Sequence, residues 1–294
     1  MYQHAVIGLE GLTLTDQEKG WLKHYTPKGV ILFARNVESP EQTKVLLADV
    51  HKHAGKDIWV AIDEEGGRVH RMPWSPFHER TQADEYGKLY KSDPDEAIKQ
   101  VFKDSYTVGM ALKELGFTHN CAPVLDIFYP QGDPIIGNRA YAKNPDIIAI
   151  LATACMFGLH DAGIEAIGKH FPGHGRANAD SHIAMPEVDT DLDTILQEAD
   201  AFPQLFAKGL KHIMTAHVAY TNIDDDVATF SKFWLHDILQ DKMDFKGDIW
   251  SDDLCMKGCG MPIPEAANKA VDAGCTVLLV CEPEGVQELM QAFA

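Results

Sequence analysis

The sequence lacks the features that mark nucleic-acid-binding, membrane-spanning and disulfide-stabilised proteins. Its 26 Lys and Arg residues face 44 Asp and Glu residues, and the resulting formal charge of −18 repels phosphate backbones and anionic lipid headgroups. No stretch approaches the roughly 18 apolar residues that a spanning helix needs. The six cysteines form no CxxC pair and are sparse for a chain of 294 residues. We therefore expect no nucleic-acid partner, no membrane association and reduced thiols.

The ends of the sequence and its internal punctuation predict one cytoplasmic domain. Residues 1–8 lack the basic segment, apolar core and small-residue cleavage site of a secretory signal. No Gly/Ser-rich or Pro-rich hinge divides the chain, so we expect a single domain over residues 1–294 and a monomer. Because the sequence stops soon after its last apolar run, the final helix, within residues 285–293, is expected to be abbreviated.

Short apolar runs alternate with amphipathic segments along the whole chain, and this order predicts a parallel sheet. Eight such repeats favour a closed (β/α)₈ barrel, an α/β fold without a second domain, over an open doubly wound sheet. The expected strands are His4–Gly11, Gly29–Arg35, Trp59–Glu65, Phe117–Asp126, Ile164–Phe171, His212–Val218, Gly247–Asp253 and Thr276–Glu282. The expected helices include Glu41–Ala54, Pro94–Leu115, Pro145–Ala162, Leu192–Leu210, Lys232–Met243 and Ile263–Ala273.

Charged and imidazole side chains gather at the carboxyl ends of four expected strands, next to glycines in two of them. In a (β/α)₈ barrel these ends converge on one face, which carries the active site. One acidic strand end is commonly just solvated, whereas four such ends predict a functional site. The segments are Asp63-Glu64-Glu65-Gly66-Gly67-Arg68, Lys169-His170-Phe171-Pro172-Gly173-His174-Gly175, His217 and Ser251-Asp252-Asp253.

Four motifs in this order resemble glycoside hydrolase family 3, and the resemblance extends over nearly the whole chain. More narrowly, the single domain and the Asp-Ser-His element resemble the β-N-acetylglucosaminidases of bacterial peptidoglycan recycling. The resemblance implies an exo-acting retaining enzyme that needs no metal or cofactor. The implied substrates are muropeptides in which N-acetylglucosamine is β-linked to anhydro-N-acetylmuramic acid. The motifs are Asp63-Glu64-Glu65-Gly66-Gly67-Arg68-Val69, Lys169-His170-Phe171-Pro172-Gly173-His174-Gly175, Asp180-Ser181-His182 and Ser251-Asp252-Asp253-Leu254.

The resemblance also implies the catalytic residues. Asp252 is the implied nucleophile that forms a covalent glycosyl-enzyme. If the strand continues, Asp253 points to the opposite side and suits a helix N-cap instead. His182, oriented by Asp180, is the implied general acid and base in place of the usual second carboxylate. An imidazole suits both steps because its unperturbed pKa lies near ~6.5.

The family pattern assigns sugar binding to five charged or imidazole residues, whose donors and acceptors match sugar hydroxyls and an acetamido group. Arg68 and His174 are interpreted as structural, with contact to the ligand as the alternative for either. Family members commonly carry Gln where this sequence has Glu64, so we expect an additional carboxylate beside the sugar and altered pKa values there. The five assigned residues are Asp63, Arg71, Arg139, Lys169 and His170.

Three alternatives accompany this interpretation. A metal-dependent barrel hydrolase could use His170, His174, His182, His217 and Asp252, but the first expected strand lacks the usual His-x-His pair. A non-catalytic carbohydrate-binding barrel would require drifted catalytic positions, which are intact here. A family member that acts on another β-glycoside, or that transfers the sugar to phosphate, is compatible with a histidine acid.

Overall fold

The computed structural model describes residues 1–181 and 185–293 and contains one eight-stranded parallel sheet. The strand order is β10-β1-β2-β3-β4-β5-β7-β9, and a parallel bridge between Trp250 and Val277 joins the two ends. The expected (β/α)₈ barrel is therefore confirmed. The strands are β1 (Ala5–Gly8), β2 (Gly29–Leu32), β3 (Trp59–Ile62), β4 (His119–Asn120), β5 (Glu165–Phe171), β7 (His212–Thr215), β9 (Asp248–Trp250) and β10 (Leu278–Val280).

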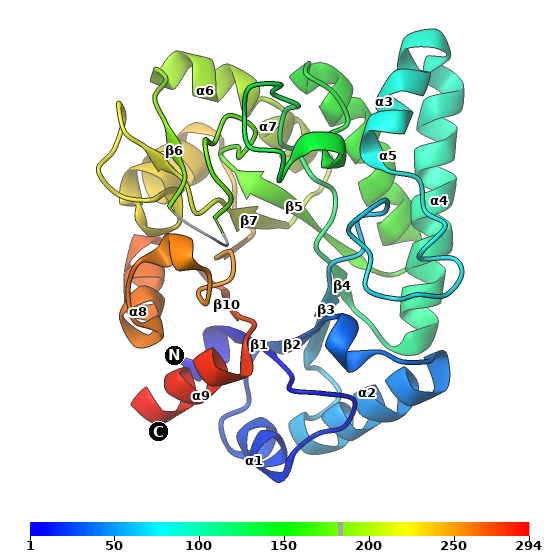
Figure 1. The fold of residues 1–294 in the computed structure, drawn as a ribbon, viewed down its shortest axis with the longest axis vertical. Coiled ribbons are helices and arrows are strands. Elements are labelled where there is room, and N and C mark those ends of the chain that lie inside the picture. Colours follow the sequence, from blue (N-terminus) through cyan, green and yellow to red (C-terminus); the bar gives the residue numbers. More distant parts are fainter. Residues whose placement is uncertain (182–184, 294) are drawn as a thin grey trace.

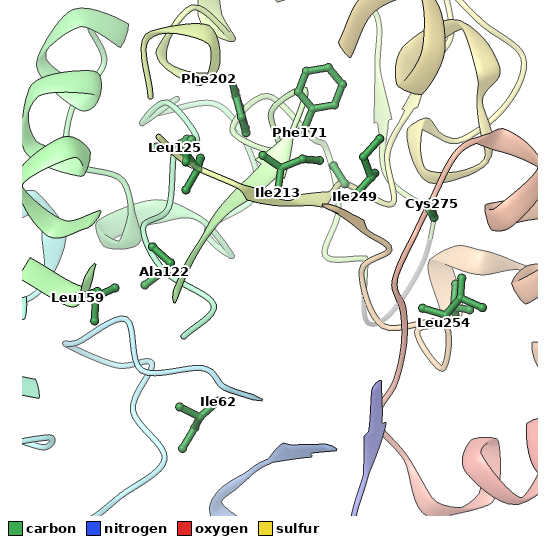
Figure 2. Packing of buried hydrophobic residues seen from close by; sticks show 14 of the residues in the cluster. Ile62, Ala122, Leu125, Leu159, Phe171, Phe202, Ile213, Ile249, Leu254 and Cys275 are labelled. Atoms are coloured by element: carbon green, nitrogen blue, oxygen red, sulfur yellow. The ribbon is translucent and has the colours of Figure 1, made fainter. Parts of the chain in front are cut away.

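Residues alternate along each strand between the barrel interior and the layer beneath the helices. The interior cluster includes Val6, Ile31 and Ala61, whereas their neighbours along the strands pack outward against helices. In Figure 2 the side chains of Phe171, Phe202, Ile213 and Ile249 lie in this outer layer. Because both faces of the sheet are buried, strands such as β1, β2 and β10 are apolar throughout, which explains why they could be recognised in the sequence.

A ring of helices surrounds the barrel, and the two chain ends lie close together (Figure 1). The Tyr2 hydroxyl donates a hydrogen bond of 3.0 Å to the carbonyl of Met290 in the last helix. In the part of the chain that the structure describes, no helix is both long and apolar enough to cross a membrane. The helices are α1 (Asp16–His24), α2 (Pro40–Ala54), α3 (Ala83–Ser92), α4 (Pro94–Leu115), α5 (Pro145–Asp161), α6 (Leu192–Glu198), α7 (Ala201–Phe206), α8 (Ile263–Ala273) and α9 (Pro283–Ala292).

Two helix predictions need correction. The segment 192–210 is not one helix but two, because Pro203 has no N–H for a helical bond to Ala199 and is tolerated only in the first turn of a new helix. The segment Phe233–Lys242 is a π-type helix, in which each bond closes one residue later than in an α-helix.

The small parallel sheet of β6 (Glu187–Val188) and β8 (Ala219–Tyr220) was not predicted. Short 3₁₀ helices cover Tyr2–His4, Ala34–Asn36, Gly137–Arg139, Ala228–Phe230 and Lys257–Cys259.

Two tryptophans and two histidines fill the amino end of the barrel, opposite the expected site. The rings of Trp59 and Trp250 stack at 5.7 Å, and His119 lies 4.4 Å from Trp59. The ring of His212 contacts both His119 and Trp250. Burial lowers the pKa of His119 to about 3 and also lowers the pKa of His212. Both imidazoles are therefore neutral in the folded protein.

This cluster predicts acid-sensitive stability. Between about pH 6.5 and 3 an unfolded histidine binds a proton that folded His119 does not bind, so stability falls as pH falls through this range. We expect His119→Phe to flatten the pH dependence of the free energy of unfolding between pH 6.5 and 4, measured by urea denaturation. Parallel curves for the two proteins would contradict this prediction.

Candidate active site

The carboxyl ends of the strands surround a cavity of about 440 Å³. Residues from β5 and from the segments that follow β3, β4 and β9 meet there, as expected for a (β/α)₈ barrel. All five predicted sugar-binding residues and the predicted nucleophile line this cavity. Its charged and imidazole groups include Asp63, Glu65, Arg71, Arg139, Lys169, His170 and Asp252.

Ion pairs fix the predicted sugar-binding side chains on one side of the cavity. Lys169 Nζ lies 2.7 Å from Asp63 Oδ1 and 2.6 Å from Glu65 Oε1. Arg139 binds Glu65 through two parallel bonds of 2.7 and 2.8 Å, and Arg71 contacts Asp63 at 3.2 Å. These five side chains alternate in charge, so each holds its neighbours in a defined geometry before any ligand arrives.

The same ion pairs keep the carboxyl groups ionised. Burial alone would raise the pKa of Asp63, but the charges of Lys169 and Arg71 lower it to about 2. Burial opposes ionisation of Glu65 as well, and Arg139 and Lys169 outweigh it, so the pKa of Glu65 is lowered. Asp63 therefore accepts hydrogen bonds over the whole physiological pH range, as recognition of sugar hydroxyls requires.

The turn after β3 explains the glycine pair of the first motif. Gly66 and Gly67 have φ values of 98° and 55°, which favour glycine. A Cβ at Gly66 would lie 2.8 Å from the carbonyl oxygen of Thr81, and one at Gly67 would lie 2.5 Å from Gln82. This tight turn returns the chain so that Arg71 reaches Asp63.

Asp126 follows β4 and binds two residues of the KHFPGHG segment. Its Oδ2 lies 2.6 Å from His170 Nδ1, and its Oδ1 accepts the backbone N–H of His174 at 2.6 Å. The Asp126 side chain is fully buried. His174 in turn lies 3.3 Å from the hydroxyl of Ser181, and it also lines the cavity.

The segment after β9 differs from the expected strand end. The strand stops at Trp250, so alternation does not separate the next two aspartates, and both Asp252 and Asp253 line the cavity. Asp253 nevertheless has a structural role, because its Oδ1 accepts backbone N–H groups from Cys255 and Cys281 at 3.0 and 2.9 Å. It is not the N-cap of an α-helix.

His217, which was expected among the strand-end groups, is buried behind this segment. Its Nδ1 lies 2.8 Å from the hydroxyl of Thr229, and its Nε2 lies 3.1 Å from the carbonyl oxygen of Asp253. Burial lowers its pKa. His217 therefore supports the backbone next to Asp252 and does not line the cavity.

The loop with the predicted proton-transfer pair is anchored at its base. Arg176 forms three hydrogen bonds of 2.6 to 2.9 Å with Glu198, and the carbonyl of Ser181 accepts the Gly258 N–H at 3.0 Å. Ser181 lines the cavity, whereas its neighbour Asp180 is not among the lining residues. The predicted acid, His182, lies outside the described residues.

The expectation for Glu64 was wrong, because its side chain does not line the cavity. Asp63 and Glu65 line the cavity, and Glu64 points the other way, where its Oε1 accepts the backbone N–H groups of Arg71 and Met72 at 2.6 and 3.0 Å. Its Oε2 is buried and has no hydrogen-bond partner among residues 1–181 and 185–293. Burial raises the pKa of Glu64 to about 7.

Glu64→Gln should stabilise the protein at alkaline pH. Above about pH 7 the folded protein holds a buried charge that costs up to about 3 kcal/mol relative to the unfolded chain, and glutamine removes this cost. Below the unfolded pKa of about 4.5 both side chains are neutral, so the stabilities should converge. Thermal unfolding at pH 5 and pH 8.5 measures the difference, and an equal effect at both values would contradict the burial argument.

Sequence reasoning missed three residues that shape the cavity. Glu65 belongs to a quoted motif but received no role, although it binds both Lys169 and Arg139. Asp126 ends an expected strand, which was a usable signal, and Ser181 lies between two predicted catalytic residues. Each acts through its contacts with other side chains or the backbone, which a pattern of residue types does not show.

A (β/α)₈ barrel with a charged cavity at the carboxyl ends of its strands is typical of one class of protein, the barrel enzymes that act on small polar substrates. Comparison with known families narrows this class. Residues 3–293 match the model of the glycosyl hydrolase family 3 N-terminal domain. The chain belongs to glycoside hydrolase family 3 and is a glycoside hydrolase.

Relatives and solved structures agree with this assignment. The chain is 38% identical to a beta-hexosaminidase of Nitrosomonas eutropha, over 98% of this chain and 83% of the relative. It superposes with a TM-score of 0.91 on NagZ from Neisseria gonorrhoeae in complex with N-trifluoroacetyl-D-glucosamine, at 34% identity over 99% of this chain and 85% of that one. A family 3 β-N-acetylglucosaminidase from a Paenibacillus species gives a TM-score of 0.90 at 29% identity, over 99% of this chain and 56% of that one.

Proposed function

We propose that this enzyme removes terminal β-linked N-acetylglucosamine by a retaining mechanism with Asp252 as the nucleophile. The observation that carries the proposal is the presence of Asp252 in the same cavity as Asp63, Lys169 and Arg139. A sugar held by these charged groups has a carboxylate in reach for attack on its anomeric carbon. The names of the relatives, beta-hexosaminidase and NagZ, support the choice of an N-acetylhexosamine.

The binding residues divide into acceptors and donors. Asp63 accepts hydrogen bonds from ring hydroxyls, while Arg71, Arg139 and Lys169 donate to hydroxyl or acetamido oxygens. These groups are already ion-paired in the described chain, so a sugar joins an ordered network and pays little for reorganisation. His170 completes this set from β5.

We assign proton transfer to Asp180 and His182. In the first step, His182 protonates the leaving oxygen while Asp252 attacks, and the product is a covalent glycosyl-enzyme. In the second step, neutral His182 removes a proton from water, which attacks the anomeric carbon and releases Asp252. Asp180 orients the imidazole and stabilises its charged form.

The proposed substrates are muropeptides met in the cytoplasm, in which N-acetylglucosamine is joined to anhydro-N-acetylmuramic acid. The proposal includes no metal or cofactor and treats the enzyme as a monomer over residues 1–294. The charge of −18 disfavours nucleic-acid and membrane partners.

The test compares 4-nitrophenyl N-acetyl-β-glucosaminide with the matching glucoside, each in phosphate and in a non-nucleophilic buffer. We expect hydrolysis of the N-acetylglucosaminide at equal rates in both buffers and release of free N-acetylglucosamine. A preference for the glucoside, or a sugar phosphate as the product, would replace the proposal by one of the other family activities. Failure of turnover by a folded wild-type enzyme would favour a binding function.

A further inference from the structure

One buried carboxylate connects a sugar-binding side chain to the loop that carries the predicted proton-transfer pair. Asp126 belongs to neither group, and its side chain is fully buried. Its two oxygens accept from different residues, Oδ2 from the imidazole of His170 at 2.6 Å and Oδ1 from the backbone of His174 at 2.6 Å. The backbone N–H of His170 lies 3.4 Å from Oδ1. An aspartate so placed determines both the ring orientation of His170 and the start of the loop.

The contacts of His170 define where its hydrogen lies. Ionised Asp126 can only accept, so the hydrogen between the two side chains is on Nδ1. On the other side of the ring, Nε2 lies 3.5 Å from Nη2 of Arg139, and a guanidinium can only donate. Nε2 is therefore the acceptor in this contact, and because 3.5 Å is long for a hydrogen bond, a closer hydroxyl donor in the cavity can take the place of Arg139.

We infer that Asp126 is a positioning residue that holds His170 in the Nδ1–H tautomer, so that Nε2 accepts a hydrogen bond from a sugar hydroxyl. The inference rests on the proposed function, because it assumes a sugar in this cavity. The same carboxylate secures the His174 backbone, and His174 contacts Ser181 between the two predicted proton-transfer residues.

Asp126→Asn tests the role of the carboxylate at almost constant shape. An aspartate offers two acceptor oxygens, whereas an asparagine offers one acceptor and a donor amide. If the amide faces His170, the ring must adopt the Nε2–H tautomer and present a donor beside the donor group of Arg139. If the amide faces His174 instead, two N–H groups oppose each other. The second arrangement opposes two donors, so we expect the first, in which the hydrogen bond to His170 is kept with its direction reversed.

The expected result is a change in sugar affinity with a change in tautomer. For Asp126→Asn we expect the inhibition constant of N-acetylglucosamine and the KM of the aryl substrate to rise about 10- to 100-fold, the range for leaving one buried hydrogen-bonding group without a partner. In ¹⁵N-histidine NMR spectra the wild-type signal of His170, assigned by its loss in His170→Gln, should show a protonated Nδ1. Asp126→Asn should abolish that Nδ1–H signature.

The matched control is Asp248→Asn, which alters another aspartate near a histidine at the opposite end of the barrel. Asp248 Oδ2 lies 3.6 Å from His212 Nδ1, and Asp248 also binds Lys28 at 3.0 Å. This variant should lower the unfolding temperature and leave KM and the inhibition constant unchanged. Activity is compared at a temperature where thermal unfolding shows all variants to be folded.

A double-mutant cycle separates positioning from general damage. In the His170→Gln background, Asp126→Asn should no longer change the inhibition constant, because the affinity effect passes through the imidazole. The inference would be overturned if Asp126→Asn kept its full effect in that background or left the affinity of the otherwise wild-type enzyme unchanged. It would also be overturned if the NMR spectra of the wild type showed His170 protonated at Nε2. If the wild type failed to turn over N-acetylglucosaminides, the proposed function would fail, whereas the NMR spectra would still decide the tautomer.

Discussion

Asp252→Asn should lower kcat for 4-nitrophenyl N-acetyl-β-glucosaminide by at least about four orders of magnitude, because the amide oxygen is too weak a nucleophile to form the glycosyl-enzyme. The sugar-binding ion pairs lie on other strands and remain intact, so the inhibition constant of N-acetylglucosamine should stay close to its wild-type value. Initial rates and product inhibition measure the two quantities on the same preparation.

The adjacent aspartate supplies the control for this prediction. Asp253 uses Oδ1 to accept two backbone N–H groups, and the oxygen of an asparagine can accept both. Asp253→Asn should therefore retain activity within about tenfold of wild type, the range of a weakened hydrogen bond. If Asp253→Asn lost as much activity as Asp252→Asn, or if Asp252→Asn kept substantial turnover, the assignment of the nucleophile would be wrong.

His182→Ala should lower kcat/KM by about 100- to 10,000-fold for substrates with poor leaving groups, the usual contribution of a general acid. Aryl glycosides with strongly acidic phenols leave without protonation, so their kcat/KM should change much less. A plot of log kcat/KM against the pKa of the leaving group should accordingly be steeper for the variant than for the wild type.

His236→Ala controls for the loss of an imidazole, because the His236 side chain is 61% exposed on the π-type helix and is not one of the residues that line the cavity. It should leave the slope of the plot unchanged. Equal losses on good and poor leaving groups in His182→Ala would contradict its role as acid. Asp180→Asn should show the same steepened slope, since Asp180 is expected to act through the imidazole.

The barrel was predictable because every strand is buried on both faces. Runs such as Val30-Ile31-Leu32 are apolar without interruption, and the helices between them carry a clear periodicity. The convergence of Asp63, Lys169 and Asp252 followed from topology alone, because the carboxyl ends of barrel strands share one face.

The remaining features depended on local geometry that residue types do not encode. The orientation of Asp253 was mispredicted because β9 ends at Trp250, and the alternation rule holds only within a strand. Glu64 was expected beside the sugar, but it binds the backbone of Arg71 and Met72. A side chain that accepts hydrogen bonds from backbone N–H groups leaves no periodic signal in a sequence.

The most direct test of the central claim is covalent trapping. The wild-type enzyme would be incubated with a 5-fluoro N-acetylglucosaminyl fluoride, which forms a glycosyl-enzyme that breaks down slowly, then digested and analysed by mass spectrometry. We predict one added sugar, located on the Asp252 side chain. A label on another residue would contradict a mechanism through Asp252. So would the absence of any adduct on an enzyme that the fluoride does not inhibit and that still hydrolyses the aryl substrate.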